Sequence, residues 1–218
     1  IGSAMMEHDD LNAAVRRVLL GENKVCGLTR EQDAQAAYEA GAIYGGLIFV
    51  ESSPRAVNEE QARKVIAAAP LSYVGVFRNA DINDVAAKAD ALSLSAVQLH
   101  GDEDQTYIDA LRHVLAPQVQ IWKAQSVGAI LPARNLTHVD KYVLDNGQGG
   151  TGQRFDWSLL RGEVLDNVLL AGGLSPDNCV EAAKTGCAGL DFNSGVESQP
   201  GIKDASKLAS VFKTLRAY

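Results

Sequence analysis

The chain has 218 residues, of which 46% are hydrophobic and 22% are charged, and this composition predicts one globular domain with a full core rather than a disordered chain. Its formal net charge of -7 argues against a nucleic-acid partner or an anionic membrane surface, because both bind clusters of Lys and Arg. The expected partner is therefore a small molecule.

Cysteine and histidine usage limits the location and the chemistry. The three cysteines lack CxxC spacing, and the sequence has no signal peptide and no long apolar run, so a reducing cytoplasm is expected. The four histidines lie too far apart for a local metal motif, and no metal is expected.

The first 21 residues differ from the rest. Residues 1–4 (IGSA) look like the tip of a strand, and residues 9–20 have the apolar spacing of an amphipathic helix. We interpret 1–21 as the remnant of a preceding domain's last βα unit, with 22–218 as the main domain. The alternative is an N-terminal helix that plugs the bottom of a barrel formed by the remainder.

From residue 22 onward, short β-branched strands alternate with helices that begin at capping residues and end near glycine. The predicted strands are 23–26, 43–49, 73–77, 96–100, 120–123, 141–145, 167–171 and 189–193. The predicted helix starts are Thr29 with Gln32, Asn58 with Gln61, Asp81, Ser175-Pro176 and Asp204. Further helices are predicted after Gly101 through Leu115, near 128–134 and, as a short helix, near 157–160. Eight strands, each followed by a helix, predict the α/β class and a single (β/α)8 TIM barrel.

In such a barrel the active site lies at the C-terminal strand ends. The polar or glycine residues expected there are Cys26, Arg55, His100, Asp145, Gly172, Gly173, Asn193, Ser194 and Gly195. Strand alternation predicts that four pairs point into the barrel: Lys24 with Cys26, Gln98 with His100, Val143 with Asp145, and Asp191 with Asn193.

Two adjacent strands end in glycine and hydroxyl residues, at Gly172-Gly173 and at Ser194-Gly195. Backbone N–H groups at such ends are free to approach an anion. Each feature alone fits a tight turn or a helix cap, but the pair predicts a phosphate site in the last quarter of the barrel.

A glycine-rich loop, GQGGTG at 147–152, matches the pattern of a dinucleotide site. The context fails, because the following strand ends in Ala171-Gly172 instead of an acidic residue for the ribose. We expect this loop to close over a substrate as a lid.

Three strand-end side chains are candidates for proton chemistry. Asp145 follows an apolar strand, where a carboxyl group is costly to bury, so a proton-handling role is expected. Cys26 lies at the barrel mouth, whereas Cys179 and Cys187 are expected to be packing residues. For His100, a positioned hydrogen-bond donor and a helix-start hydrogen bonder both remain open.

Six ordered motifs carry a family resemblance. They are KVCGLT (24–29), SPR (53–55), VQLHG (97–101), LD (144–145) followed by GGTG (149–152), AGGL (171–174) and NSGVE (193–197). In these motifs, residues 22–218 resemble phosphoribosylanthranilate isomerases. Residues 1–20 are similar to the last strand and helix of indole-3-glycerol-phosphate synthase, which is fused ahead of the isomerase in enteric-type bacteria.

The resemblance implies a cofactor-free Amadori rearrangement of an N-phosphoribosyl anthranilate. It implies that Asp145 is the general acid and Cys26 the general base, that Arg55 pairs with the anthranilate carboxylate, and that the phosphate lies near Gly173 and Ser194. It also implies a monomeric cytoplasmic domain fused to a synthase. Because a free thiol has a pKa near 8.5, we expect Lys24 to stabilise the thiolate.

Two other functions remain open. One is an isomerase or lyase acting on another sugar phosphate, because many barrels share a phosphate site. The other is a catalytically silent barrel that serves as a docking domain.

Overall fold

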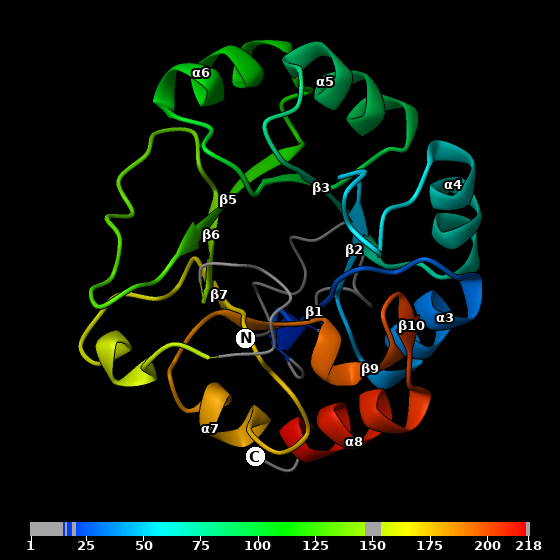
Figure 1. Cartoon of the computed structure of the whole chain (residues 1–218), viewed down its shortest axis with the longest axis vertical. Helices are drawn as coiled ribbons and strands as arrows, with labels where there is room; N and C mark the ends of the chain where they lie inside the picture. The colour runs from blue at the N-terminus through cyan, green and yellow to red at the C-terminus, as the bar shows by residue number, and fades with distance from the viewer. Residues whose placement is uncertain (1–14, 16, 19–20, 147–153, 217–218) are drawn as a thin grey trace.

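The chain folds as a closed ring of parallel strands with helices around it. The computed structural model describes residues 15, 17, 18, 21–146 and 154–216. Eight strands pair in the order β1 to β8, and β8 returns to pair with β1, so the barrel is closed. Figure 1 shows the strands in the centre and the helices forming the outer ring. The predicted (β/α)8 barrel is confirmed.

Each predicted strand overlaps an observed one. The strands are β1 Lys24–Val25, β2 Tyr44–Ile48, β3 Ser72–Phe77, β4 Ala96–Leu99, β5 Gln120–Ser126, β6 Lys141–Asp145, β7 Val168–Leu170 and β8 Gly189–Phe192. A short antiparallel hairpin, β9 Glu197–Gln199 with β10 Ile202–Lys203, follows the barrel. Sequence reasoning missed this hairpin.

The helices are α3 Glu31–Ala40, α4 Glu59–Ala68, α5 Ile82–Ala91, α6 Gln105–Val114, α7 Cys179–Ala183 and α8 Ala205–Arg216, with 3₁₀ turns η1 Trp157–Leu160 and η2 Ser194–Val196. The predicted capping box of Asn58 with Gln61 is confirmed in both directions. Asp81 caps α5 by accepting hydrogen bonds from the N–H groups of Asn83 and Asp84, as predicted.

Three helix predictions are wrong. The first is the capping box at Thr29: Arg30 is the N-cap of α3, because the Thr29 hydroxyl donates to the distant Gly201 carbonyl. The second is the start of α7, which begins only at Cys179. Asn178 uses its side chain to accept from Ser175 N–H and to donate to the Gly173 carbonyl, and this turn delays the helix.

The third error is the helix predicted near 128–134, because residues 127–140 connect β5 to β6 without a helix. Pro132 lacks an N–H and disfavours a helical conformation at the preceding residue. β5 instead continues to Ser126, and the N–H of Val127 then donates to the Asp145 carbonyl at 2.8 Å.

The barrel interior is packed at its lower end and open at its upper end. A buried apolar cluster comprises Ile43, Tyr44, Val74, Ala96, Trp122, Ala124, Val143, Leu169 and Ala171. Within it, the Tyr44 and Trp122 rings meet edge to face, with 4.8 Å between their centroids. This layer closes the barrel beneath the strand ends, so side chains above it line a cavity with a solid floor.

The described part of the N-terminal segment contacts the barrel bottom. The Arg17 guanidinium lies 5.9 Å from the centroid of the Tyr44 ring, and the N–H of Gly21 donates to the Arg17 carbonyl at 3.0 Å. Most of 1–21 lies outside the described residues, so the domain boundary at 21/22 stays a prediction. In the described part of the chain, no helix is both long enough and apolar enough to cross a membrane.

Candidate active site

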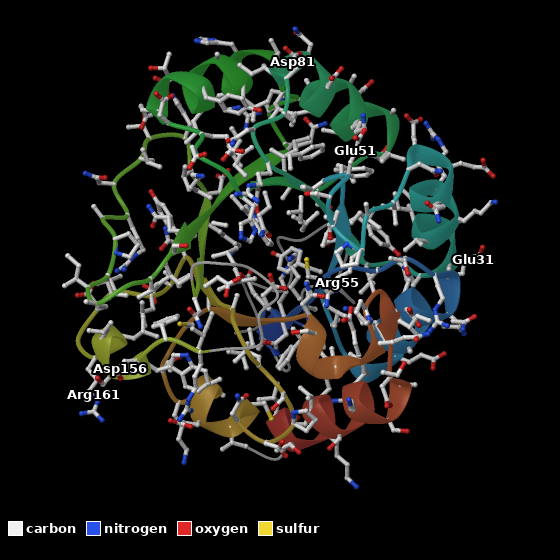
Figure 2. The ribbon with its side chains drawn as sticks, in the orientation of Figure 1. Glu31, Glu51, Arg55, Asp81, Asp156 and Arg161 are labelled. Atoms are coloured by element: carbon white, nitrogen blue, oxygen red, sulfur yellow. The ribbon has the colours of Figure 1, made fainter. Side chains whose placement is uncertain are left out.

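A cavity of about 570 Å³ opens at the C-terminal ends of the strands. Figure 2 shows Arg55 pointing into the middle of the ring, whereas Asp81 and Asp156 lie at its outer edge. The cavity contains all the predicted site residues: Cys26, Arg55, His100, Asp145, Gly172, Gly173, Asn193, Ser194 and Gly195. Their location is as predicted, and their roles stay predictions.

Cys26 lies directly after β1, where its N–H donates to the Phe192 carbonyl of β8 at 2.8 Å. Its side chain is buried, and Gly46 on β2 leaves the space beside it: a Cβ on residue 46 would lie 2.7 Å from Cys26 Sγ. The thiol is therefore held in a tight slot between the first two strands.

The ion pair of Lys24 with Asp191 lies beneath this thiol. Lys24 is fully buried, and its Nζ donates to Asp191 Oδ2 at 2.8 Å. Burial raises the pKa of Cys26, the Lys24 ammonium lowers it, the Asp191 carboxylate raises it, and the net direction is upward. Lys24 lowers the pKa of the Cys26 thiol, as expected, but in the free enzyme burial raises this pKa by more.

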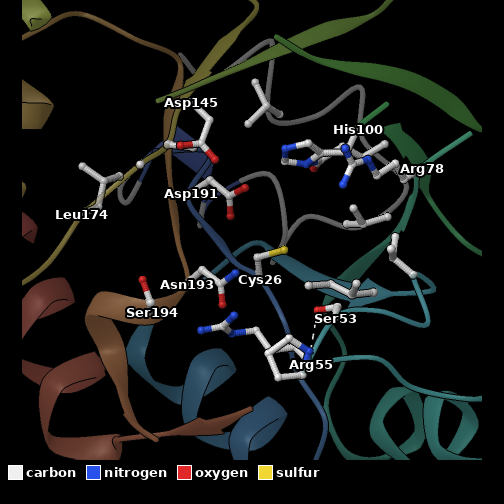
Figure 3. Close-up of a pocket in the computed structure, with 18 of the residues that line it drawn as sticks. Cys26, Ser53, Arg55, Arg78, His100, Asp145, Leu174, Asp191, Asn193 and Ser194 are labelled. Atoms are coloured by element: carbon white, nitrogen blue, oxygen red, sulfur yellow. Dashed lines mark hydrogen bonds between the residues drawn. The ribbon is translucent and has the colours of Figure 1, made fainter. Parts of the chain in front are cut away.

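Asp145 ends β6 and faces the same cavity from another wall, as Figure 3 shows. Burial raises the pKa of its carboxyl group, although the N–H of Asn146, which donates to Oδ1 at 2.6 Å, acts against the shift. A carboxyl group with a raised pKa keeps its proton to higher pH, and this is the state that a general acid needs.

His100 follows β4 and lies in the cavity beside Arg78 (Figure 3). The N-cap of α6 is Asp104, which accepts from Tyr107 N–H, so His100 does not start that helix. Burial lowers the pKa of the imidazole, while the Asp145 carboxylate raises it, and the net shift is downward. His100 is thus a neutral hydrogen-bonding group at the cavity wall near pH 7.

Arg55 is paired inside the protein, which the sequence did not predict. Its Nε lies 2.9 Å from Glu197 Oε1, and its Nη2 lies 2.7 Å from Glu197 Oε2. The hydrogen bond to Glu197 raises the pKa of the guanidinium despite partial burial. Glu197 belongs to the quoted NSGVE motif, but nothing local in the sequence indicates its partner.

The two predicted anion-binding ends have the expected backbone character. Gly172 and Gly173 have φ values of 87° and 66°, a region that L side chains rarely adopt. Ser194 and Gly195 open η2, and the first N–H groups of a helix have no partner within it. Both ends line the same cavity.

Two further charged residues line the cavity and were missed as site candidates. Arg78 is exposed and follows β3 directly, so the rule of polar strand ends would have found it. Asp191 was predicted to point inward but was given no role, and its Oδ1 is buried without a hydrogen-bond partner among the described residues.

The predicted lid at 147–152 lies outside the described residues. Within the described ranges, no group of three or more His, Cys, Asp or Glu side chains is arranged to hold a metal ion. The expectation that no metal is needed stays a prediction.

Comparison with known proteins decides the family. Residues 23–214 match the family model of N-(5'phosphoribosyl)anthranilate (PRA) isomerase. The chain belongs to this isomerase family. The assignment made from the six sequence motifs is confirmed, and with it the prediction that the chain is an isomerase.

Several curated relatives are longer than this chain. The chain is 77% identical over 218 residues to the tryptophan biosynthesis protein TrpCF of Salmonella typhi, covering 100% of this chain and 48% of that protein. It is 69% identical over 218 residues to TrpCF of Yersinia pestis, covering 46% of it. The chain thus spans about half the length of these curated relatives.

Solved isomerase structures share the fold. Phosphoribosyl anthranilate isomerase from Thermus thermophilus is 31% identical with a TM-score of 0.80, and the match covers 90% of this chain and 98% of that one. A second isomerase, solved in complex with reduced 1-(o-carboxyphenylamino)-1-deoxyribulose 5-phosphate, is 28% identical with a TM-score of 0.73, over 91% of this chain and 100% of that one.

Proposed function

We propose that this chain catalyses the Amadori rearrangement of N-(5'-phosphoribosyl)anthranilate to 1-(2-carboxyphenylamino)-1-deoxyribulose 5-phosphate in tryptophan biosynthesis. The observation that carries the proposal is that Cys26 and Asp145 enter one cavity from β1 and β6. The same cavity contains glycine-rich strand ends suited to a phosphate and a guanidinium suited to a carboxylate.

Asp145 acts first, as the general acid. It gives its proton to the ribose ring oxygen, the bond between C1 and that oxygen breaks, and an open-chain Schiff base forms. The upward shift in the pKa of the buried carboxyl group supports this role, because the proton is retained near neutral pH longer than on a solvated aspartate.

Cys26 acts second, as the general base that removes the proton from C2. The enolamine that results takes up a proton at C1 as its hydroxyl becomes the ketone, so the product has the same composition as the substrate. Burial raises the pKa of the free thiol, so a thiolate needs additional positive charge. The cationic Schiff base supplies that charge beside Sγ, together with the Lys24 ammonium beneath it.

Binding is assigned to groups away from the proton transfers. The substrate phosphate accepts hydrogen bonds from backbone donors around Gly173 and Ser194-Gly195, with Gly172 and Asn193 shaping the same end of the cavity. The anthranilate carboxylate pairs with Arg55, and His100 contributes a hydrogen bond at the wall.

The test is a progress curve with N-(5'-phosphoribosyl)anthranilate that follows the loss of substrate anthranilate fluorescence. Loss of fluorescence catalysed by the wild type, and abolished in a Cys26→Ala/Asp145→Asn double variant, would support the proposal. No catalysis by the wild type would return the chain to a docking role. Turnover of an unrelated sugar phosphate alone would indicate a different isomerase or lyase.

We also propose that this chain is one domain of a longer protein. The chain spans about half of its TrpCF relatives, which fits an isomerase domain fused behind an indole-3-glycerol-phosphate synthase domain. We infer a cytoplasmic, cofactor-free enzyme whose isomerase domain works as a monomer. Analytical ultracentrifugation tests whether the domain is a monomer. Activity after exhaustive dialysis against a chelator tests whether it needs a cofactor.

A further inference from the structure

Glu197 connects the cavity with the hairpin that follows β8. Its side chain is buried, and both carboxylate oxygens are in use. Besides Arg55, Oε1 accepts from Lys203 Nζ at 2.8 Å and from Gly201 N–H at 3.2 Å. Burial would raise the pKa of this carboxyl group, but the hydrogen bonds from Arg55 and the nearby Lys203 lower it below its ordinary value. Glu197 is therefore an anion held between two cations.

The geometry of the Arg55 pair leaves one edge of the guanidinium for a ligand. A guanidinium presents two edges that fit a carboxylate, one formed by Nε and Nη2 and one by Nη1 and Nη2. Glu197 occupies the first edge. Nη1 makes no hydrogen bond with any residue that the structure describes. In Figure 3 the guanidinium lies beside Asn193, within the cavity.

The stem of Arg55 is held as closely as its head. A Cβ on Gly27 would lie 2.7 Å from Arg55 Cδ and 2.9 Å from Asn193 Oδ1, so the stem crosses the backbone next to Cys26. Asn193 Oδ1 in turn accepts from Lys203 Nζ at 3.0 Å. The aliphatic part of Arg55 is held over Gly27, and its Nε/Nη2 edge is bonded to Glu197. The remaining Nη1/Nη2 edge is therefore held in a single orientation.

We propose that Glu197 is a positioning residue that turns the free edge of Arg55 toward the substrate carboxylate, and so fixes the aromatic ring of the substrate relative to Cys26. This inference rests on the proposed function, because it assigns the ligand of Arg55. Glu197 itself does not touch the substrate. It acts through Arg55 and selects for a carboxylate on the ring.

A purely electrostatic role predicts the opposite effect, and this makes the inference testable. Removing the Glu197 anion leaves the cations Arg55 and Lys203 with more net positive charge, and this favours an anionic ligand. If positioning dominates, the same change weakens carboxylate recognition, because the guanidinium is no longer held in one direction.

The experiment measures binding of two ligands by calorimetry. One is reduced 1-(o-carboxyphenylamino)-1-deoxyribulose 5-phosphate, and the other is its phenyl counterpart without the carboxylate. The wild type should prefer the carboxylate ligand by at least about 10-fold, the usual worth of a charge-assisted pair. In Glu197→Gln this preference should fall below about threefold, as it should in Arg55→Met.

Two further variants keep the result unambiguous. Glu103→Gln removes an equally buried carboxylate, which pairs with Lys123 at 2.9 Å and does not line the cavity, and its preference should stay near that of the wild type. Lys203→Met removes a cation but leaves Glu197 on Arg55, so the preference should also persist. Thermal melts of all variants establish that they are folded.

An unchanged or increased preference in Glu197→Gln overturns the inference while leaving the proposed function intact. Loss of the preference in Lys203→Met with retention in Glu197→Gln does the same, because net charge would then be the cause. If the wild type binds neither ligand, the proposed function fails, and the inference falls with it.

Discussion

Gly46 and Cys26 are neighbours across the first two strands of the barrel, and a Cβ on residue 46 would lie 2.7 Å from Cys26 Sγ and 2.9 Å from Cys26 Cα. Gly46→Ala must therefore displace the thiol from its slot. If Cys26 is the general base, kcat should fall by at least about 10²-fold, the lower bound for loss of a positioned acid or base.

The neighbouring glycine provides the control. A Cβ on Gly45 points to the other face of β2, where the nearest atoms are the flexible ends of Leu28 and Leu71 at 3.0 Å. Gly45→Ala should retain kcat within about threefold, because small shifts of those side chains accommodate it. Steady-state kinetics of both variants test whether Gly46 holds Cys26 in place. Equal kcat values for the two variants would show that Gly46 does not position the thiol.

The two proposed proton-transfer groups should respond separately to substitution. Cys26→Ala and Asp145→Asn should each lower kcat by about 10²- to 10⁴-fold, with a much smaller effect on substrate binding. Cys26→Ser should be nearly as poor as alanine, because a hydroxyl is a far weaker base near neutral pH. A near-normal kcat in either Cys26 variant would assign this side chain to packing.

Asp145→Asn should stabilise the protein at neutral pH. The pKa of the native Asp145 carboxyl group is raised above its ordinary value of 3.8. The protonated group therefore contributes to the stability of the folded state fully below pH 3.8, and this contribution is lost as the pH rises through the native pKa. The wild type therefore loses a stabilising contribution as the pH rises toward neutrality, whereas the uncharged amide of the variant does not titrate. The melting temperature of the variant should exceed that of the wild type.

The pH dependence of that difference distinguishes the cause. The gap between variant and wild type should shrink as the pH is lowered through the raised pKa of the native carboxyl group, because that group then regains its proton. A gap that is constant across the series would mean that the amide stabilises the fold by a contact unrelated to protonation.

Lys24 and Asp191 should shift the Cys26 titration in opposite directions. Loss of the ammonium in Lys24→Met should raise the pKa of the thiol further, and loss of the carboxylate in Asp191→Asn should lower it. Thiolate absorbance against pH, in a background with Cys179 and Cys187 replaced by alanine, measures both shifts. Shifts of the same sign would show that the pair acts on Cys26 through structure and not through charge.

The proposed phosphate site should be sensitive to an added negative charge. Ser194→Asp places a carboxylate at one of the two glycine-rich ends of the cavity, and like-charge contact should raise KM by at least about 10-fold. Ser198→Asp, four residues later on the exposed part of β9, adds the same charge away from the cavity and should leave KM near the wild-type value.

The ends of the strands and the residues that face the barrel interior could be predicted from the sequence, because the alternation of side chains along a strand is a local property. Val143 and Asp145, or Gln98 and His100, are two residues apart and share a face whatever the remainder of the chain does. The cavity could therefore be located before the structure was known. What each side chain does in it is a question for the variants above.

Pairings between distant elements were not accessible in this way. Arg55 and Glu197 are 142 residues apart, and no local pattern connects them. The Thr29 hydroxyl forms a hydrogen bond with a carbonyl 172 residues away, and so a local capping motif failed. The helix predicted between β5 and β6 was wrong for a different reason: it followed from the regular alternation of strands and helices, and the proline at 132 was not taken into account.

The ion pair of Lys24 with Asp191 joins residues 167 positions apart. On the ribosome β1 therefore emerges long before its carboxylate partner, and an ammonium without that partner resists burial. The interior around Cys26 can close only when β8 has been synthesised. A nascent chain or a prematurely terminated one thus contains the Cys26 thiol without its native surroundings, and isomerase activity should appear only once nearly the whole coding sequence has been translated.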